Sequence, residues 1–560
     1  MSQLQKAIRF KRFKIKDGGK VKLIITNKHG DAITFNILDC SINGMRVVAE
    51  TVTSQDYDWV DIGGIISNSK IIWENKEVSL GRLVLRRFQP ENHEFGFSTV
   101  DIQVPVSGPL SHHFDQEFIQ NDSFVDKELS SEKFSLAHFV ENDYASRDLF
   151  DRVKEFSYFH AEWVKSKKYG YQNFRSNSKG SRINLKRKRK NGRVDYLLMG
   201  SNDYLGLGAH PEVIEAAKQA LDVYGFGSTG SPVTTGLSDL HFELCEKLAR
   251  MHLKDSALLF NSGYAANIGI ISSLCAANDL IIADQLCHAS IQDAMQMAKG
   301  TSRFFKHNNA DHLRQVLERE RSNFNGCLVI TEGVFSMDGD VALLNEIFQV
   351  AREFNCRIMV DQAHCWGVIG PNGLGVCDKY NLLKDVDIIM GTFSKIAGGI
   401  GGFAVGSKEV IDWLRFFARS QMFSVSIPPS TAAAVSKAID IFQNDKSLLY
   451  NLKLNIQHFI KGLRNLGYNI DSNHESAVVP VVIGDESIMG DMYQSLLEDG
   501  VWCVPIVYPA VSRKNCRFRF TMMATHSISD LDYVLICLEK AAMKSNFQFS
   551  SQSLEKKQAA

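Results

Sequence analysis

The chain has 560 residues, enough for several domains of average size. Its 63 lysines and arginines balance its 63 aspartates and glutamates, which excludes a global field that would attract nucleic acid or an anionic membrane. Eleven scattered cysteines without a CxxC pair, and no apolar run long enough to span a bilayer, predict a soluble cytoplasmic protein without a transmembrane segment.

The first 105 residues are predicted to form a small antiparallel β-barrel. Short segments such as VKLIIT, AITFNIL, GRLVLRRF and EFGFSTVDI alternate apolar and polar residues and are separated by turn sequences. From residue 106 to residue 144 the composition becomes polar and irregular, as in GPLSHHFDQEF and DKELSSEK. This second stretch is predicted to be a linker.

A helix and a hairpin are predicted after the linker. Between residues 143 and 168 apolar side chains recur at helical spacing, and NLKRKRKNGRVDYLL follows with Asn191 and Gly192 at a turn. The basic run at 186–190 allows a nucleic-acid contact, but its place beside the turn favours a solvated strand face. No nucleic-acid partner is therefore expected.

The remainder of the chain is predicted to be a large α/β fold with a mostly parallel sheet. Helical stretches such as HPEVIEAAKQALDVYG alternate with apolar runs such as SALLF, LIIAD, CLVIT, RIMVD and DIIMG. Within residues 145–560 we expect a large domain at about 200–430, a smaller C-terminal α/β domain at about 431–545, and a disordered tail at 546–560.

Lys395 in the sequence GTFSK lies among hydroxyls and glycines, which suits a lysine that forms a Schiff base with pyridoxal phosphate (PLP). PLP also needs a carboxylate at its ring nitrogen, a flat group against the ring, and donors for its phosphate. Asp361 ends the apolar run RIMVD, and His288 follows the run LIIAD. The sequence NSGY at 261–264 opens a helix whose first amides suit a phosphate, and Thr392 adds a hydroxyl.

Nine motifs follow one another in the order in which a single family carries them. They are SNDYLGLGAHP, YGFGSTGS, SGYAAN, HASI, TEGVFSMDGD, VDQAH, GTFSK, FSVSIPP and RFRFTMMATH. On these motifs, the region from about residue 171 to just beyond residue 526 resembles the α-oxoamine synthases, a family of fold-type I PLP-dependent transferases. The resemblance implies a large mixed, mostly parallel sheet and a smaller C-terminal α/β domain.

The resemblance also implies a role for each matching residue. Lys395 is similar to the lysine that forms the Schiff base and removes the Cα proton, Asp361 to the partner of the ring nitrogen, and His288 to the ring that stacks on the cofactor. His364 is similar to the histidine that bonds the ring's phenolic oxygen. The other expected cofactor-binding residues are Ser262, Gly263, Tyr264, Glu332, Ser336, Thr392 and Ser394. No metal is expected.

Two residues are expected to hold the substrate carboxylate. Arg519 in RFRF and Asn202 in SNDYLGL match the family positions, and a guanidinium binds a carboxylate with two donors. Arg517 is a rival, because it lies two residues away on the same strand face.

The family reaction is a decarboxylative condensation of a small amino acid with an acyl thioester, which gives an α-amino ketone. The resemblance also implies a homodimer. The amino acid (glycine, alanine or serine) and the acyl carrier (coenzyme A or a carrier protein) stay open. Two alternatives are an aminotransferase on the same fold, and a nucleotide-sensing protein whose synthase half is inactive.

The N-terminal segment carries the pattern Asp39-x-Ser41-x-x-Gly44. With the flanking strand pattern, it resembles the PilZ domain, a small β-barrel that binds cyclic di-GMP in many bacteria. Arg9 and Arg12 are candidates for the family's arginine arm, although their spacing differs from Arg-x-x-x-Arg. The five residues are the candidate cyclic di-GMP ligands, and the dinucleotide would regulate the synthase.

Overall fold

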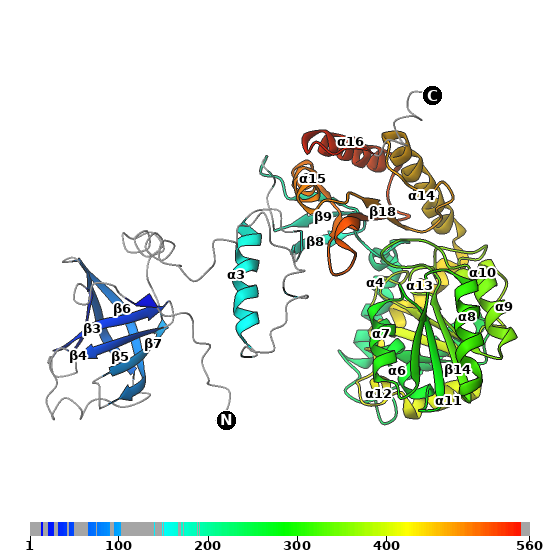
Figure 1. Cartoon of the computed structure of the whole chain (residues 1–560), viewed down its shortest axis with the longest axis horizontal. Coiled ribbons are helices and arrows are strands. Elements are labelled where there is room, and N and C mark those ends of the chain that lie inside the picture. The colour runs from blue at the N-terminus through cyan, green and yellow to red at the C-terminus, as the bar shows by residue number, and fades with distance from the viewer. Residues whose placement is uncertain are drawn as a thin grey trace. The chain divides into compact units, whose positions relative to one another are not determined.

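Figure 1 shows the computed structural model of the chain. It describes residues 150–549 apart from 166–169, 172, 187, 188 and 190, the single residues Phe139 and Asp148, and the backbone of seven strands among the first 101 residues. The chain divides into two units, Met1–Ser130 and Ser131–Ala560. The expected linker at 106–144 lies outside the described residues, apart from Phe139.

The first unit contains antiparallel strands. They are β1 (Phe13–Lys14), β2 (Val21–Thr26), β3 (Ala32–Ser41), β4 (Gly44–Ala49), β5 (Ile65–Trp73), β6 (Lys76–Gln89) and β7 (Glu94–Asp101). Their order in the sheet is β1-β3-β2-β5-β6-β7-β4, and β3 also pairs with β4.

The second unit begins with the predicted helix and hairpin. Helix α3 (Asp151–Lys165) carries an aromatic row that reaches Tyr171, whose ring lies 5.7 Å from that of Trp163. Strands β8 (Arg175–Lys179), β9 (Arg182–Leu185) and β10 (Asp195–Leu198) are antiparallel, and Gly192 takes a φ of 79° in the loop between β9 and β10. Strand β10 also pairs in parallel with β19 (Val501–Trp502), so this segment belongs with the end of the chain.

Arg189, in the basic run of that hairpin loop, is not solvated as the sequence predicts. Its side chain is only 11% exposed and donates to the carbonyl oxygens of Glu498 (3.1 Å) and Asp499 (2.9 Å). These carbonyls end helix α15 (Glu486–Asp499), where the last C=O groups lack partners within the helix. Arg189 therefore caps the C-terminal end of α15.

A mixed, mostly parallel sheet of seven strands forms the core of the large domain, as predicted. The strands are β11 (Ser256–Phe260), β12 (Asp279–Asp284), β13 (Thr301–Phe305), β14 (Gly326–Glu332), β15 (Arg357–Asp361), β16 (Ile388–Thr392) and β17 (Gly402–Gly406), in the order β11-β17-β16-β15-β14-β12-β13. All neighbours are parallel except those of β17. The strands are almost continuously apolar, as expected for a sheet covered on both faces.

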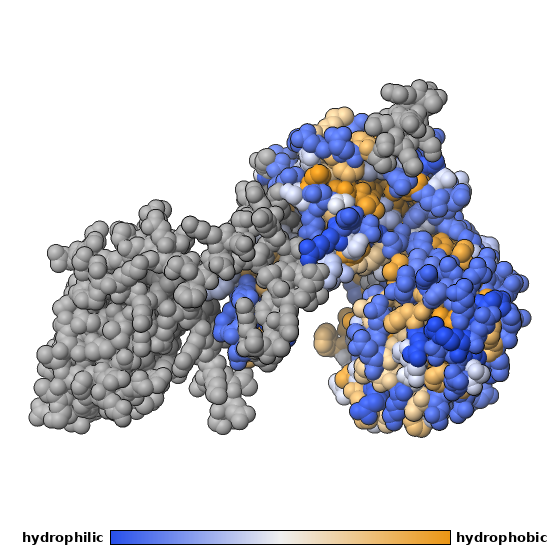
Figure 2. Space-filling view, in the orientation of Figure 1, coloured by the Kyte–Doolittle hydropathy of each residue, from blue (hydrophilic) through white to orange (hydrophobic). Residues whose placement is uncertain are grey.

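Helices surround this sheet (Figure 1). Helix α6 packs on β16 and β17, α9 on β15, α8 on β13, and α5 and α11 on β11, while α13 packs on α4 and α5. The helices of this domain are α4 (Pro211–Tyr224), α5 (Asp239–Met251), α6 (Gly263–Leu274), α7 (Ala289–Met297), α8 (Ala310–Glu320), α9 (Leu344–Glu353), α10 (Val376–Lys379), α11 (Lys408–Phe417), α12 (Arg419–Met422) and α13 (Pro429–Asn444). Hydrophilic side chains cover most of the described surface in the view of Figure 2, as amphipathic covering helices require.

The C-terminal part has a small antiparallel sheet in the order β18-β21-β20, formed by β18 (Val478–Val482), β20 (Val504–Ile506) and β21 (Arg517–Thr521). Helices α14 (Lys446–Leu466) and α15 pack on α16 (Ile528–Lys544). Phe547 and Phe549 differ from the expected disordered tail at 546–560, because they lie against the ring of Tyr468 at centroid distances of 5.7 and 5.1 Å. Residues 550–560 of that expected tail lie outside the described residues. In the part of the chain that the structure describes, no helix combines the length and apolarity needed to cross a bilayer.

Candidate active site

Four parallel strands of the large sheet end in polar residues. These are Asp284 on β12, Glu332 on β14, Asp361 on β15 and Thr392 on β16. The carboxyl ends of parallel strands meet at one edge of a sheet, the usual place for a ligand in α/β folds. A cavity of about 240 Å³ is found at this edge.

The cavity brings together every expected cofactor-binding residue except Ser336. It is lined by Ser262, Gly263, Tyr264, Asn267, His288, Ser290, Glu332, Asp361, Ala363, His364, Met390, Thr392, Ser394, Lys395, Ile400 and Gly401. Asn267 and Ser290 were not predicted from the sequence. The nearby Ser336 is described below through its carbonyl oxygen.

Lys395 lies in the turn that follows β16 and faces this cavity. Its side chain is partly exposed, yet protein atoms crowd around it, and this desolvation lowers the pKa of its ammonium to about 8. The Asp361 carboxylate opposes the shift, and the Arg519 guanidinium adds to it. A substantial fraction of Lys395 is therefore a neutral, nucleophilic amine at a mildly alkaline pH.

Asp361 is buried and held by two donors. Its Oδ1 accepts from the backbone N–H of Ala363 (2.8 Å), and its Oδ2 accepts from Nδ2 of Asn267 (2.9 Å). Asn267 also donates to Oγ of Ser290 (2.9 Å). A carboxylate has about four lone-pair sites. Asp361 can therefore accept a further proton donor from the cavity.

His288 begins helix α7 and is fixed by its own first turn. Its Nδ1 accepts from the backbone N–H of Ser290 (3.2 Å) and lies 2.8 Å from the Ser290 hydroxyl, while its backbone N–H donates to the Glu332 carboxyl. Burial lowers the pKa of His288 and raises that of Glu332 well above its usual value. A neutral, flat imidazole therefore lines the cavity.

The far end of the cavity is formed by the start of α6. Ser262 caps this helix by accepting from the N–H of Ala265 (3.0 Å), and Gly263 is so close to Thr392 that a Cβ there would lie 3.1 Å from the Thr392 Cβ. Thr392 Oγ1 donates to the carbonyl of Gly401 (2.8 Å) and lies 2.9 Å from the Ser394 hydroxyl. Hydroxyls beside a helix N-terminus are suited to a phosphate.

Tyr264 closes the same end from the protein surface. Its ring is 46% exposed and lies edge-on to His288 at 6.4 Å, and its hydroxyl donates to Asp293.

The two residues expected to hold a carboxylate are in contact. Arg519 on β21 donates from Nη1 to Oδ1 of Asn202 (3.2 Å) and from Nε to the carbonyl of Ser336 (2.7 Å). Arg517 is directed elsewhere, since its Nη1 donates to Asp338 Oδ1 (2.6 Å) and to the carbonyl of Met337 (3.1 Å).

Tyr204 is a further polar side chain of this region that the sequence did not reveal. Its hydroxyl lies 2.7 Å from Nδ1 of His364. Burial raises the pKa of Tyr204 to about 12 and lowers that of His364, so both groups are neutral. Its position in SNDYLGL, two residues after Asn202, was the available signal.

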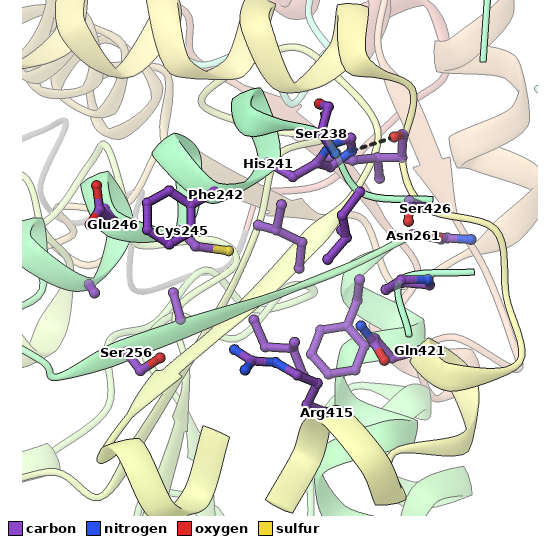
Figure 3. A pocket seen from close by; sticks show the side chains of 18 of the residues that line it. Ser238, His241, Phe242, Cys245, Glu246, Ser256, Asn261, Arg415, Gln421 and Ser426 are labelled. Carbon is purple, nitrogen blue, oxygen red and sulfur yellow. Dashed lines mark hydrogen bonds between the residues drawn. The ribbon is translucent and has the colours of Figure 1, made fainter. Parts of the chain in front are cut away.

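A second hollow, of about 450 Å³, lies beside β11 and contains none of the expected site residues. Figure 3 shows Arg415 and Gln421 on one side of it, and His241, Phe242 and Cys245 of α5 on the other. Apolar atoms supply most of its lining, and no lysine that could form a Schiff base with PLP is among the described residues that line it.

Of the candidate cyclic di-GMP ligands, Asp39 and Ser41 lie on β3 and Gly44 opens β4, with Ser41 opposite Gly44. The side chains of these residues, and the whole of Arg9 and Arg12, lie outside the described residues.

Comparison with known proteins decides the family of the second unit. The model of the aminotransferase class I and II family matches residues 194–537. The chain belongs to this family. Residues of the chain are also 41% identical to the serine palmitoyltransferase of Bacteriovorax stolpii over 339 residues, which is 60% of this chain and 80% of that protein. The 8-amino-7-oxononanoate synthase of Treponema denticola is 39% identical over 342 residues, 61% of this chain and 86% of that protein.

Solved structures give the same result. A serine palmitoyltransferase from S. paucimobilis, solved with a PLP–myriocin aldimine, is 29% identical, with a TM-score of 0.68 over 71% of this chain and all of that one. Another serine palmitoyltransferase, solved with its PLP internal aldimine, is 30% identical with the same TM-score. The chain is therefore an enzyme, a PLP-dependent acyltransferase of the α-oxoamine synthase type.

The residues present fit PLP. The buried Asp361 carboxylate has lone pairs left for a ring nitrogen, and Lys395 is a lysine of lowered pKa in the same cavity. Gly263 leaves room where a side chain would crowd Thr392, next to hydroxyls and the first turn of α6.

Proposed function

We propose that this enzyme condenses a small amino acid (glycine, alanine or serine) with an acyl thioester of coenzyme A or a carrier protein, with loss of carbon dioxide, to give an α-amino ketone. The observation that carries the proposal is the placement of Lys395 and Asp361 in one cavity, with the Arg519–Asn202 pair next to Ser336. The kinship with serine palmitoyltransferase and 8-amino-7-oxononanoate synthase supports this reaction over others of the fold.

In this proposal each residue does what its surroundings favour. PLP, when bound, supplies an electron sink that makes the Cα proton of the amino acid acidic. Asp361 would hold the ring nitrogen of PLP and favour its protonated form, because a carboxylate stabilises a proton on its hydrogen-bond partner. Lys395 accepts the Cα proton at Nζ, and a base with a pKa of about 8 is well matched to a near-neutral reaction.

The substrate carboxylate is assigned to Arg519 and Asn202. A guanidinium that is already fixed by two acceptors loses little freedom when it binds a carboxylate, so it can orient the bond to be broken. In the overall reaction a bond forms between Cα and the acyl carbon, the acyl C–S bond breaks, and the thiolate takes up the proton that left Cα. The bond between Cα and the carboxylate then breaks to release carbon dioxide, and a proton from solvent replaces the carboxylate on Cα.

The test is a matrix of substrates. Purified enzyme with PLP is mixed with glycine, alanine or serine and with acyl thioesters of increasing chain length, carried on coenzyme A or on an acyl carrier protein, and free thiol and carbon dioxide are measured together. We expect both products with one amino acid and a narrow range of chains. A keto acid formed without thiol would instead support the aminotransferase alternative, and the absence of any turnover would favour the inactive synthase half.

We also propose that the working form is a homodimer. Several large apolar side chains of the described residues are exposed, including Phe226 (91%), Phe423 (68%) and Ile400 (60%), and Ile400 also lines the cofactor cavity. The resemblance to the α-oxoamine synthases implies a homodimer, and a second copy of the chain would cover apolar surface of this kind. Light scattering should give twice the chain mass of 62.8 kDa, and the mass of one chain would contradict the proposal.

For the first unit we propose a PilZ-like barrel that binds cyclic di-GMP and thereby regulates the synthase part of the same chain. We also propose that the protein is cytoplasmic. The strand pairings support a barrel, because β3 pairs with both β2 and β4 and so links the two ends of the row from β2 to β4. The ten described cysteines are all free, which supports a reducing compartment.

Calorimetry of the whole protein with cyclic di-GMP tests the proposed ligand. Binding is expected for the wild type and is expected to weaken in Asp39→Ala. If the folded protein releases no heat up to millimolar ligand, the proposed ligand is wrong.

A further inference from the structure

The loop at residues 336–340, with the sequence SMDGD, carries two aspartates that the proposed chemistry does not use. It follows β14 and leads to α9, and the pairing of Val334 with Val341 closes its base. The carbonyl oxygen of Ser336, its first residue, accepts from Nε of Arg519. The position of this loop therefore helps to set the position of the Arg519 guanidinium.

One end of the loop is held by a histidine between two aspartates. The Nδ1 of His307 lies 3.0 Å from Oδ1 of the fully buried Asp284, and its Nε2 lies 2.8 Å from Oδ2 of Asp340. A histidine with a carboxylate at each nitrogen donates from both, which requires the imidazolium form. Burial alone would lower the pKa of His307, but the two aspartates outweigh it and raise the pKa to about 10.

Two neighbours strengthen this contact. Asn308, in a left-handed conformation with φ of 50°, donates its N–H to Asp284 (2.8 Å) and its side-chain amide to Asp340 (2.9 Å). The ring of Phe335 lies edge-on to His307 at 4.4 Å. The cation is thus fixed in place and shielded from water on one side, which makes its ion pairs stronger than exposed ones.

The middle of the loop is held from the small sheet. Arg517 on β21, only 5% exposed, donates to Asp338 (2.6 Å) and to the carbonyl of Met337 (3.1 Å). Gly339 takes a φ of 68° and lies so close to β18 that a Cβ would be 2.2 Å from the carbonyl oxygen of Val478. The loop is therefore fixed between the large sheet and the small sheet that carries Arg519.

We infer that His307 and Arg517 are positioning residues: they hold the 336–340 loop so that its Ser336 carbonyl keeps the Arg519 guanidinium turned toward the substrate carboxylate. The inference rests on the proposed function only in assigning that carboxylate to Arg519. Neither residue lines the cofactor cavity, so the cofactor itself is expected to bind unchanged in their absence.

The test uses His307→Gln and Arg517→Gln as independent variants of the full-length protein loaded with PLP. Glutamine keeps hydrogen-bonding capacity but not the charge. The dissociation constant of the preferred amino acid is measured from the change in PLP absorbance, without any thioester. We expect this dissociation constant to rise about 10- to 100-fold in each variant, because a small displacement of the Arg519 guanidinium weakens its contact with the substrate carboxylate. The affinity for PLP should stay within about twofold of the wild-type value.

A matched control is His458→Gln. His458 forms a similar contact with Asp532 (2.7 Å) on the protein surface, far along the sequence from the loop, and its removal should leave amino-acid binding at the wild-type value.

A double-mutant cycle separates positioning from general destabilisation. In an Arg519→Lys background the guanidinium is absent, so His307→Gln should add little further loss of amino-acid affinity. Full additivity of the two substitutions, or wild-type affinity in both His307→Gln and Arg517→Gln, would overturn the inference. If the wild type binds an amino acid but condenses it with no thioester, the proposed reaction fails, and the affinities still decide the role of the loop.

Discussion

Replacing Lys395 with alanine is expected to remove both the covalent attachment of PLP and the reaction. Lys395 is the only lysine among the described residues that line the cavity, and its lowered pKa leaves a substantial neutral fraction that can react with an aldehyde near pH 8. Loss of the base that accepts the Cα proton should lower kcat by about 10²- to 10⁴-fold. Absorbance of the PLP-loaded protein and borohydride trapping followed by peptide mass analysis measure the attachment, and thiol release measures the rate.

The matched control is Lys408→Ala. This lysine is exposed and pairs only with Asp412 in the described structure, so its removal should change neither quantity. If Lys395→Ala, with a wild-type circular dichroism spectrum, still traps PLP on a lysine, then another lysine carries the cofactor and the assignment of this cavity is wrong.

Asp361→Asn is expected to leave PLP attached but largely inactive. The substitution keeps the shape of the side chain, and its amide can still bond to Asn267, so folding should change little. It removes the negative charge that favours a protonated ring nitrogen, and the loss of one such preorganised electrostatic contact typically costs about 10²- to 10³-fold in kcat. Steady-state thiol release with saturating substrates gives the value, and the visible PLP band shows that Lys395 still holds the cofactor.

Asp440→Asn serves as the control for this second substitution, because Asp440 pairs with Lys247 at the surface of the large domain. Wild-type turnover by Asp361→Asn would show that the ring nitrogen does not depend on this carboxylate.

Much of the large domain could be predicted because its signals are local. Apolar runs such as LIIAD and RIMVD become buried parallel strands, and the polar residue that ends each run reaches the same sheet edge. A parallel sheet thus converts positions far apart in sequence into one site, and this rule placed Asp361 and Lys395 in a common cavity.

Other features depend on contacts between distant segments, which periodicity does not reveal. In the sequence, Asn267 is one polar residue within an apolar helix. It becomes a hydrogen-bond partner of Asp361 only because folding brings α6 close to the end of β15. Arg189 reads as one member of a basic run, yet it binds the end of α15 more than 300 residues later. The parallel pairing of β10 with β19 has the same origin, since neither strand carries a signal for its partner.

Arg517 and Arg519 illustrate the limit most clearly. Both lie on the same face of β21 at alternate positions, so strand geometry cannot choose between them. Their neighbours differ: Asp338 accepts from Arg517, and Asn202 accepts from Arg519. The distinction comes from the 336–340 loop and the 202 region, which the chain brings together only on folding.

The most direct test of the proposed reaction is a mass balance. Enzyme loaded with PLP is incubated with one carboxyl-labelled amino acid and one acyl-CoA, and carbon dioxide, free thiol and amino ketone are counted in the same sample. We expect the three products in equal amounts with the wild type, and each of them reduced at least about 100-fold with Lys395→Ala. Thiol without carbon dioxide, or a keto acid without thiol, would contradict decarboxylative condensation.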